Sequence, residues 1–181
     1  MKRRPAAVAV VVVAGDSGDE LLVVRRAMYP GDPWSGHIAL PGGSSEPGDH
    51  SLEETARRET LEETGIDLAE SECVAALGSV VPQSKGAPRV SITPFVFRHR
   101  GARLVTLSPE IVESWWIPVA EFENPGAWRT TTIATPSGIL INTRAFELRG
   151  HTLWGLTERV IDEFMEMRAL GRPQRERPGA G

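Results

Sequence analysis

The sequence predicts an α+β or α/β/α layered domain, and three observations support this prediction. Short runs rich in valine and other apolar residues are separated by glycine, proline and aspartate, as in strands joined by turns. One helical segment lies in the middle of the chain and another near its end. The 181 residues suffice for one domain with its own core. We expect that domain over residues 1–170 and a flexible Arg/Pro/Gly-rich tail over residues 171–181.

The first predicted element is a β-hairpin. Residues 6–14 form a valine-dominated run, a Gly/Asp turn follows, and residues 20–26 form a second apolar run. The apolar runs are far shorter than the roughly 20 residues of a membrane span. Further strands are expected at residues 37–40, 73–81, 89–99 and 115–117, and a late hairpin at 139–141 and 143–149.

Two helices complete the predicted layers. The first is expected over residues 51–64, because Ser51 can cap its first turn and Glu54 lies where a capping box needs an acid. Gly65 follows the last helical residue, where a left-handed C-cap belongs. The second helix is expected over residues 156–169.

Composition restricts the possible functions. Cys73 is the only cysteine, which excludes an intramolecular disulfide and a cysteine-built zinc site. The net charge of −4 argues against a nucleic-acid binder held by bulk charge. Without a membrane span or a signal peptide, we expect a cytoplasmic protein with no membrane partner and no nucleic-acid partner.

Three acids share one face of the first helix. Glu59, Glu62 and Glu63 are spaced i, i+3, i+4, and two of them extend the apolar stripe of Leu52 and Ala56. Carboxylates gathered on an inward face repel each other, and a divalent cation would offset that repulsion. Oxygen ligands indicate Mg²⁺ or Mn²⁺ rather than zinc. The alternative is a solvated acidic face without a ligand.

The segment over residues 40–66, LPGGSSEPGDHSLEETARRETLEETGI, resembles the Nudix box. R-E-T-L-E-E-T-G-I supplies the second half of the box, with Thr60 at a position that is usually aliphatic. G-G-S-S-E-P-G-D fits the longer loop of the coenzyme A pyrophosphatase branch, as L-W-G-L-T at residues 153–157 fits the start of that branch's last helix. The resemblance implies an α/β fold, namely a Nudix-type α/β/α sandwich with a mixed sheet and a loop–helix–loop catalytic box.

The resemblance also implies a catalytic centre. Its metal ligands would be Glu59, Glu62 and Glu63, with a backbone carbonyl of Gly42 or Gly43. Arg58 would orient the acids through a bidentate pair with Glu63 or Asp49. The implied general base is Glu59 first, and Glu113 or Glu110 second; the two later acids could equally belong to a solvated turn.

Candidate substrate contacts lie outside the helix. Gly43 sits in a turn where backbone can approach a ligand closely, and either Arg25 or Arg26 could face the substrate, Arg25 being our choice. Lys85 and Arg89 could bind a terminal phosphate, unless they belong to an exposed basic loop without a ligand.

Nudix hydrolases cleave a diphosphate that links a nucleoside to another group. The resemblance therefore implies a small-molecule nucleotide substrate, such as coenzyme A or a derivative, cut to adenosine 3′,5′-bisphosphate and a phosphopantetheine. The segment before the box lacks the Arg-x-His pair of the coenzyme A branch, so ADP-ribose, dinucleotides and modified nucleoside triphosphates remain alternatives. A non-catalytic Nudix-fold nucleotide sensor is an alternative of another class. Dimers are common in the family, so a homodimer is one expected assembly.

Overall fold

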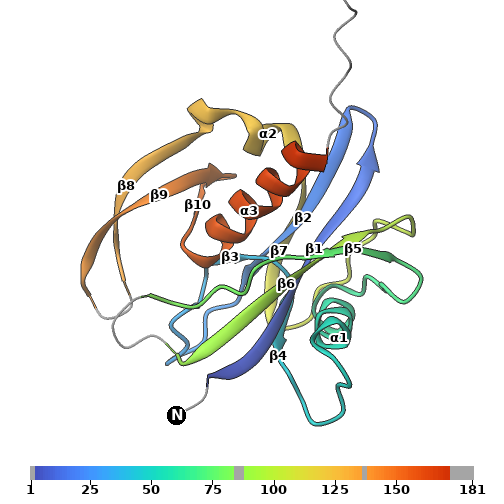
Figure 1. The fold of residues 1–181 in the computed structure, drawn as a ribbon. Coiled ribbons are helices and arrows are strands. Elements are labelled where there is room, and N and C mark those ends of the chain that lie inside the picture. The colour runs from blue at the N-terminus through green and yellow to red at the C-terminus, as the bar shows by residue number, and fades with distance from the viewer. Residues whose placement is uncertain (1–2, 84–87, 136–137, 172–181) are drawn as a thin grey trace, which may run out of the picture.

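The computed structural model describes residues 3–83, 88–135 and 138–171. Along the chain lie β1 (Arg4–Gly15), β2 (Gly18–Arg26), β3 (Ile38–Ala39), β4 (Gly42–Ser44), α1 (Leu52–Thr64), β5 (Glu72–Ala76), β6 (Val90–Arg98), β7 (Ile111–Pro118), α2 (Val119–Glu123), a 3-10 turn (Pro125–Ala127), β8 (Trp128–Ala134), β9 (Leu140–Leu148), β10 (His151–Trp154) and α3 (Leu156–Gly171). Figure 1 shows their arrangement.

The larger sheet has seven strands and is mixed, as predicted. Its main path runs β3-β2-β1-β6-β5, while β4 pairs with β1 and β7 pairs with β2. Strands β1 and β6 are parallel, and the other pairs are antiparallel. The predicted first hairpin is confirmed, with Gly15 paired to Gly18 across its turn.

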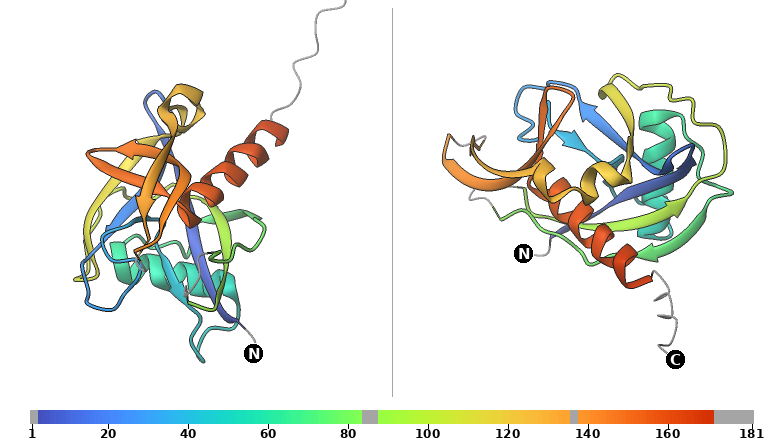
Figure 2. Two further views of the ribbon diagram at one scale, coloured as in Figure 1. Left: turned by 90° about the vertical axis from the view of Figure 1, so that its left-hand side faces the viewer. Right: turned by 90° about the horizontal axis from the view of Figure 1, so that it is seen from above.

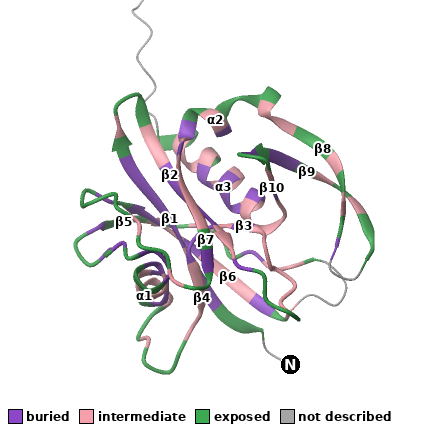
Figure 3. Cartoon of the chain, turned by 180° about the vertical axis from the view of Figure 1, so that it is seen from behind, coloured by how far each residue is buried: buried purple, intermediate pink, exposed green. Residues whose placement is uncertain are grey.

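Two cores cover the opposite faces of this sheet and explain the valine-rich sequence of β1. Val10 and Val12 face a core shared with α3, whereas Ala9 and Val11 face a second core shared with Ala56 of α1. Because β1 is buried on both faces, it reads as a continuous apolar run instead of an alternating one. The sheet lies between α1 and α3, as in an α/β/α sandwich (Figures 1 and 3).

A second, three-stranded sheet of order β10-β9-β8 projects beside α3 (Figure 2). The predicted hairpin between residues 139–141 and 143–149 is wrong, because residues 140–148 form the single strand β9. The turn that follows β9 has positive φ at both Arg149 and Gly150, which matches a two-residue hairpin turn into β10.

Other boundaries differ from the prediction. Strand β5 ends at Ala76, and Val80 forms only an isolated bridge to Ile92. Helix α3 continues to Gly171, which was expected to be the first residue of the tail, and residues 172–181 lie outside the described residues. In the described part of the chain, no helix is long and apolar enough to cross a membrane.

Candidate active site

Two glycines bring the backbone of β4 close to β1 and to helix α1. A Cβ on Gly42 would lie 2.3 Å from the carbonyl oxygen of Ala7, a clash that no side chain can avoid. A Cβ on Gly43 would lie 2.4 Å from the carboxyl carbon of Glu59. The two glycines therefore let the backbone of β4 approach the Glu59 carboxylate more closely than any other residue would allow.

Helix α1 begins and ends as predicted. The Ser51 hydroxyl accepts a hydrogen bond from the Glu54 backbone N–H at 3.1 Å. The Glu54 carboxylate accepts from the His50 N–H at 2.8 Å, one residue before the partner of a standard capping box. Gly65 has φ +70 and its N–H donates to the Leu61 carbonyl at 2.9 Å.

Arg58 fastens the loop before α1 to the helix. Its guanidinium donates two hydrogen bonds to Asp49, at 2.9 and 3.1 Å, which selects Asp49 from the two predicted partners. It also donates to the Ser44 carbonyl at 3.2 Å and pairs with Glu59 at 3.0 Å and Glu62 at 3.1 Å. The Arg58 guanidinium holds the pKa of Asp49 well below its usual range, and the pKa of Arg58 itself is raised.

The three predicted ligands differ in burial. Glu63 is only 4% exposed, and its carboxylate accepts a hydrogen bond from the Gly42 N–H at 2.9 Å. Burial raises the pKa of Glu63 to about 7. Burial also raises the pKa of Glu59, and Glu62 and Glu110 add to that rise by repulsion. The Glu62 side chain is 58% exposed, so the solvated-face alternative describes Glu62 but not Glu59 or Glu63.

These acids open into a cavity of about 680 Å³ between the two sheets. The predicted site residues that line it are Gly42, Gly43, Arg58, Glu59, Glu62 and Glu63. Glu110, the alternative general base, also lines the cavity. One cavity thus joins backbone carbonyls, carboxylates and an arginine, which is a suitable set for an anionic substrate held through a cation.

Three predicted site residues do not line the cavity. The Arg25 guanidinium is 2.5 Å from the Glu113 carboxylate, and His151 of β10 lies 3.3 Å from the same carboxylate. The side chains of Arg25, Glu113 and His151 thus join β2, β7 and β10. Arg89 is exposed, next to Pro88, which does line the cavity. Lys85 lies outside the described residues.

Arg26 takes the place that Arg25 was expected to fill. It lines the cavity, donates to Asp32 at 2.9 Å and lies 3.9 Å from the Glu63 carboxylate. Its Nε atom is buried and has no hydrogen-bond partner among the described residues. A register shift against β7 falls between Arg25 and Arg26. The sequence showed two adjacent arginines at the end of a strand. It did not show the register shift, so it could not tell which arginine faces the cavity.

The carboxylates suit a hard divalent cation by their chemistry. Within residues 3–83, 88–135 and 138–171, however, no three His, Cys, Asp or Glu side chains are grouped as a ready-made metal site. Glu59 and Glu62 pair with Arg58, whereas Glu63 accepts from Gly42. Each carboxylate has a second oxygen, so a cation could bind beside these contacts, and it would favour the charged forms of Glu59 and Glu63, which burial and mutual repulsion disfavour.

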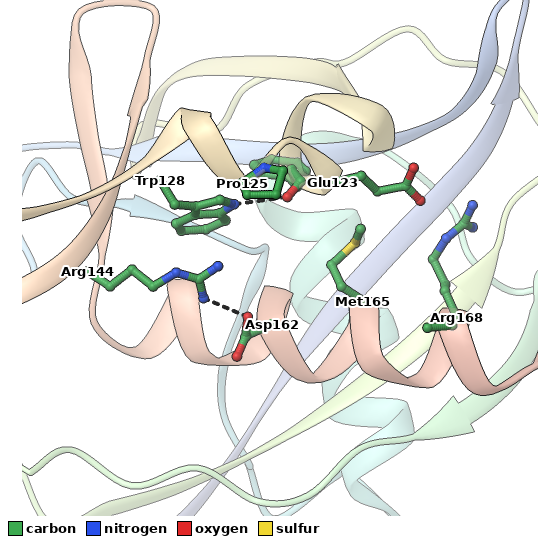
Figure 4. Close-up of a pocket in the computed structure, with 9 residues that line it drawn as sticks. Glu123, Pro125, Trp128, Arg144, Asp162, Met165 and Arg168 are labelled. Atoms are coloured by element: carbon green, nitrogen blue, oxygen red, sulfur yellow. Dashed lines mark hydrogen bonds and ion pairs between the residues drawn. The ribbon is translucent and has the colours of Figure 1, made fainter.

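A smaller cavity of about 420 Å³ lies between α2, β8 and α3 (Figure 4). Arg144 lies over the Trp128 ring at 4.2 Å and pairs with Asp162 at 2.6 Å. Arg168 also lines this cavity and pairs with Asp19 at 2.6 Å. No predicted site residue within the described ranges lines it, so the larger cavity is the candidate site.

Comparisons with known proteins show the family of the chain. Residues 3–134 match the family described as NUDIX domain. The uncharacterized protein C14C4.10c of Schizosaccharomyces pombe is 37% identical over 110 residues, which are 58% of this chain and 33% of that protein. The chain thus spans about a third of the length of that relative. The mitochondrial coenzyme A diphosphatase NUDT8 of Mus musculus is 28% identical over 182 residues, covering 94% of this chain and 82% of that protein.

Among solved structures, an Ap4A hydrolase binary complex from C. elegans superposes with a TM-score of 0.61. The alignment covers 92% of this chain and 98% of that chain at 17% identity, a level that supports the shared fold alone. The fold, the box helix with its glutamates and the match over residues 3–134 agree with one another. The chain therefore belongs to the Nudix family of hydrolases.

Proposed function

We propose that this chain hydrolyses the diphosphate linkage of a nucleoside diphosphate joined to another group, with a divalent cation. The observation that carries the proposal is the cavity in which Glu59, Glu62 and Glu63 meet the glycine turn of β4. A buried carboxylate such as Glu63, with a pKa raised to about 7, is costly unless a bound cation offsets its charge.

Coenzyme A or a derivative is the first candidate substrate. The support is the similarity to the coenzyme A diphosphatase NUDT8 along 94% of this chain, together with the long-loop form of the box. ADP-ribose, dinucleotides and modified nucleoside triphosphates are the alternatives.

The residue roles are those that the resemblance to the Nudix box implies, and the support for them is that these residues line one cavity. Glu59, Glu62, Glu63 and the Gly42 carbonyl would hold Mg²⁺ or Mn²⁺, which offsets diphosphate charge and lowers the pKa of a bound water. Arg58 keeps the loop and helix in register through Asp49. Gly43 leaves room for the Glu59 carboxylate.

The reaction needs a group that accepts a proton from the attacking water. The water oxygen bonds to one phosphorus, the bridging P–O bond breaks, and the proton passes to a carboxylate in the cavity. Glu59 is our first candidate, because burial raises its pKa toward neutrality, and Glu110 is the second. Glu113 is less suited to this role, since it is paired with Arg25 outside the cavity.

A substrate panel tests the proposal. The purified chain is incubated with coenzyme A, ADP-ribose, a dinucleoside polyphosphate and a modified nucleoside triphosphate, with Mg²⁺, Mn²⁺ or EDTA. We expect metal-dependent cleavage of at least one compound, and adenosine 3′,5′-bisphosphate plus a phosphopantetheine from coenzyme A. Tight nucleotide binding without turnover on the whole panel would instead favour the non-catalytic sensor.

A further inference from the structure

The large cavity continues beyond the carboxylates toward an aromatic wall. Trp34 and His37 come from the loop after β2, and Trp154 ends β10. The His37 and Trp154 rings lie 5.1 Å apart between centroids, at an angle of 56°. His37 also interacts electrostatically with Asp32 and Arg26, so the aromatic wall is connected to the Glu63 end of the cavity through adjacent side chains.

Part of this wall lies beyond the residues that match the family. The match ends at residue 134, whereas Ile141, Thr143, Trp154 and Leu156 also line the cavity. They belong to β9, β10 and the start of α3, and β10 packs against β3 (Figure 1). The Thr157 hydroxyl donates to the Ile38 carbonyl at 3.0 Å, which fixes the start of α3 against β3.

The chemistry of this wall suits a planar, uncharged group. Burial lowers the pKa of His37, so its ring is neutral near pH 7, although Asp32 acts in the opposite direction. The charged side chains on the adjoining turn of α3 already have partners: Glu158 pairs with Arg144, and Arg159 donates to the Val81 carbonyl. Tryptophan and neutral imidazole faces stack on aromatic rings, and such stacking stabilises a bound nucleobase.

The size of the cavity points the same way. A volume of about 680 Å³ is in the range of sites that enclose a whole ligand rather than a diphosphate alone. A diphosphate at the carboxylates would leave the aromatic end to whatever group lies a few bonds away on the substrate.

We propose that Trp34, His37 and Trp154 bind the nucleobase of the substrate, while its diphosphate lies at the α1 carboxylates. This inference rests on the proposed function for the position of the diphosphate. It makes Trp154, which follows the matched residues 3–134 and lies in the L-W-G-L-T segment, a specificity residue of the cavity.

Product binding provides the test. The Kd of AMP and of ribose 5-phosphate, which differ by the base, is measured by calorimetry with Mg²⁺ for the wild type and for Trp154→Ala. We expect the wild type to bind AMP more tightly than ribose 5-phosphate. Trp154→Ala should raise the Kd of AMP about tenfold and leave the Kd of ribose 5-phosphate unchanged, because only the base loses its stacking partner.

Two control variants and one replacement variant accompany this test. Trp154→Phe retains a ring and should recover most of the affinity for AMP. Trp116→Ala removes a tryptophan whose N–H donates to the Arg103 carbonyl outside the cavity, and it should not change either Kd. If Trp154→Ala does not fold, as judged by its thermal transition, His37→Ala replaces it, with the same selective loss expected.

Several results would overturn the inference. One is a wild-type protein that binds AMP no more tightly than ribose 5-phosphate. Another is a Trp154→Ala variant that loses the same affinity for both ligands. A third is a Trp154→Ala variant that binds 4′-phosphopantetheine more weakly but AMP as tightly as the wild type does. That result would assign the wall to the part of the substrate on the other side of the diphosphate. Base-dependent AMP binding without hydrolysis on the panel would contradict the proposed function alone, whereas hydrolysis without base-dependent binding would contradict this inference alone.

Discussion

At the scale of single residues, two adjacent arginines have different surroundings. Arg25 pairs with Glu113 and helps to join β10 to the larger sheet, whereas Arg26 lies in the cavity beside Glu63. From the sequence we placed both arginines at the strand end and expected Arg25 to face the substrate. Which of the two side chains faces the cavity depends on a register shift in the pairing of β2 with β7. Such a shift is a property of the pairing between distant strands, so local sequence could not reveal it.

This difference gives the first prediction. Arg26→Ala should lower kcat/KM by about 10- to 100-fold, because a charged hydrogen-bond donor beside Glu63 and the substrate site is lost. Arg25→Ala is the matched control, and it should lower the thermal midpoint while leaving kcat/KM unchanged. Steady-state kinetics and thermal unfolding of both variants check this, and an equal loss of kcat/KM in the two would contradict it.

At the scale of elements, the loop–helix unit was largely predictable and the second sheet was not. Ser51, Glu54 and Gly65 carry local capping signals that depend on a few neighbouring residues. Strand β8 reads W-R-T-T-T-I-A, which lacks a strong apolar run because the strand is at a sheet edge and partly exposed. The turn between β9 and β10 uses Arg149 at positive φ, where Asn or Asp is the usual signal.

The glycine turn of β4 allows a prediction at this scale. Gly43→Ala should lower kcat by about 100-fold, because its Cβ would displace the Glu59 carboxylate, and small displacements of catalytic groups have large effects on rate. Gly48 lies in the loop between β4 and α1, where an added Cβ meets nothing within 4 Å, and Gly48→Ala should leave kcat unchanged. Kinetics of both variants test this. A Gly43→Ala enzyme with the wild-type kcat would show that Glu59 tolerates displacement.

At the scale of the whole molecule, the site is assembled from segments that are far apart in the sequence. The box supplies the carboxylates, and it was recognisable because its letters follow one another along the chain. The opposite wall comes from the loop after β2 and from β9, β10 and α3. Its residues are ordinary aromatic and apolar types that sequence assigns equally well to a core, so only the fold shows that they face a cavity.

Whole-chain charge was similarly uninformative about the site. The net charge of −4 includes Glu59, Glu62 and Glu63, which are gathered at one end of the cavity. A bound cation would locally reverse the unfavourable effect of these charges on an anionic substrate. The charge of the site therefore depends on the cation and not on the composition of the chain.

We infer that carboxylates of α1 hold a divalent cation for diphosphate hydrolysis. The most direct measurement is the initial rate on the best substrate of the panel as a function of Mg²⁺ concentration, for the wild type, Glu63→Gln and Glu53→Gln. Glu53 lies in the same helix but pairs with Arg57 instead of lining the cavity. We expect no activity in EDTA, a loss of kcat of about 100-fold in Glu63→Gln at saturating Mg²⁺, and wild-type rates in Glu53→Gln. Full kcat in Glu63→Gln, or activity that persists in EDTA, would contradict the claim.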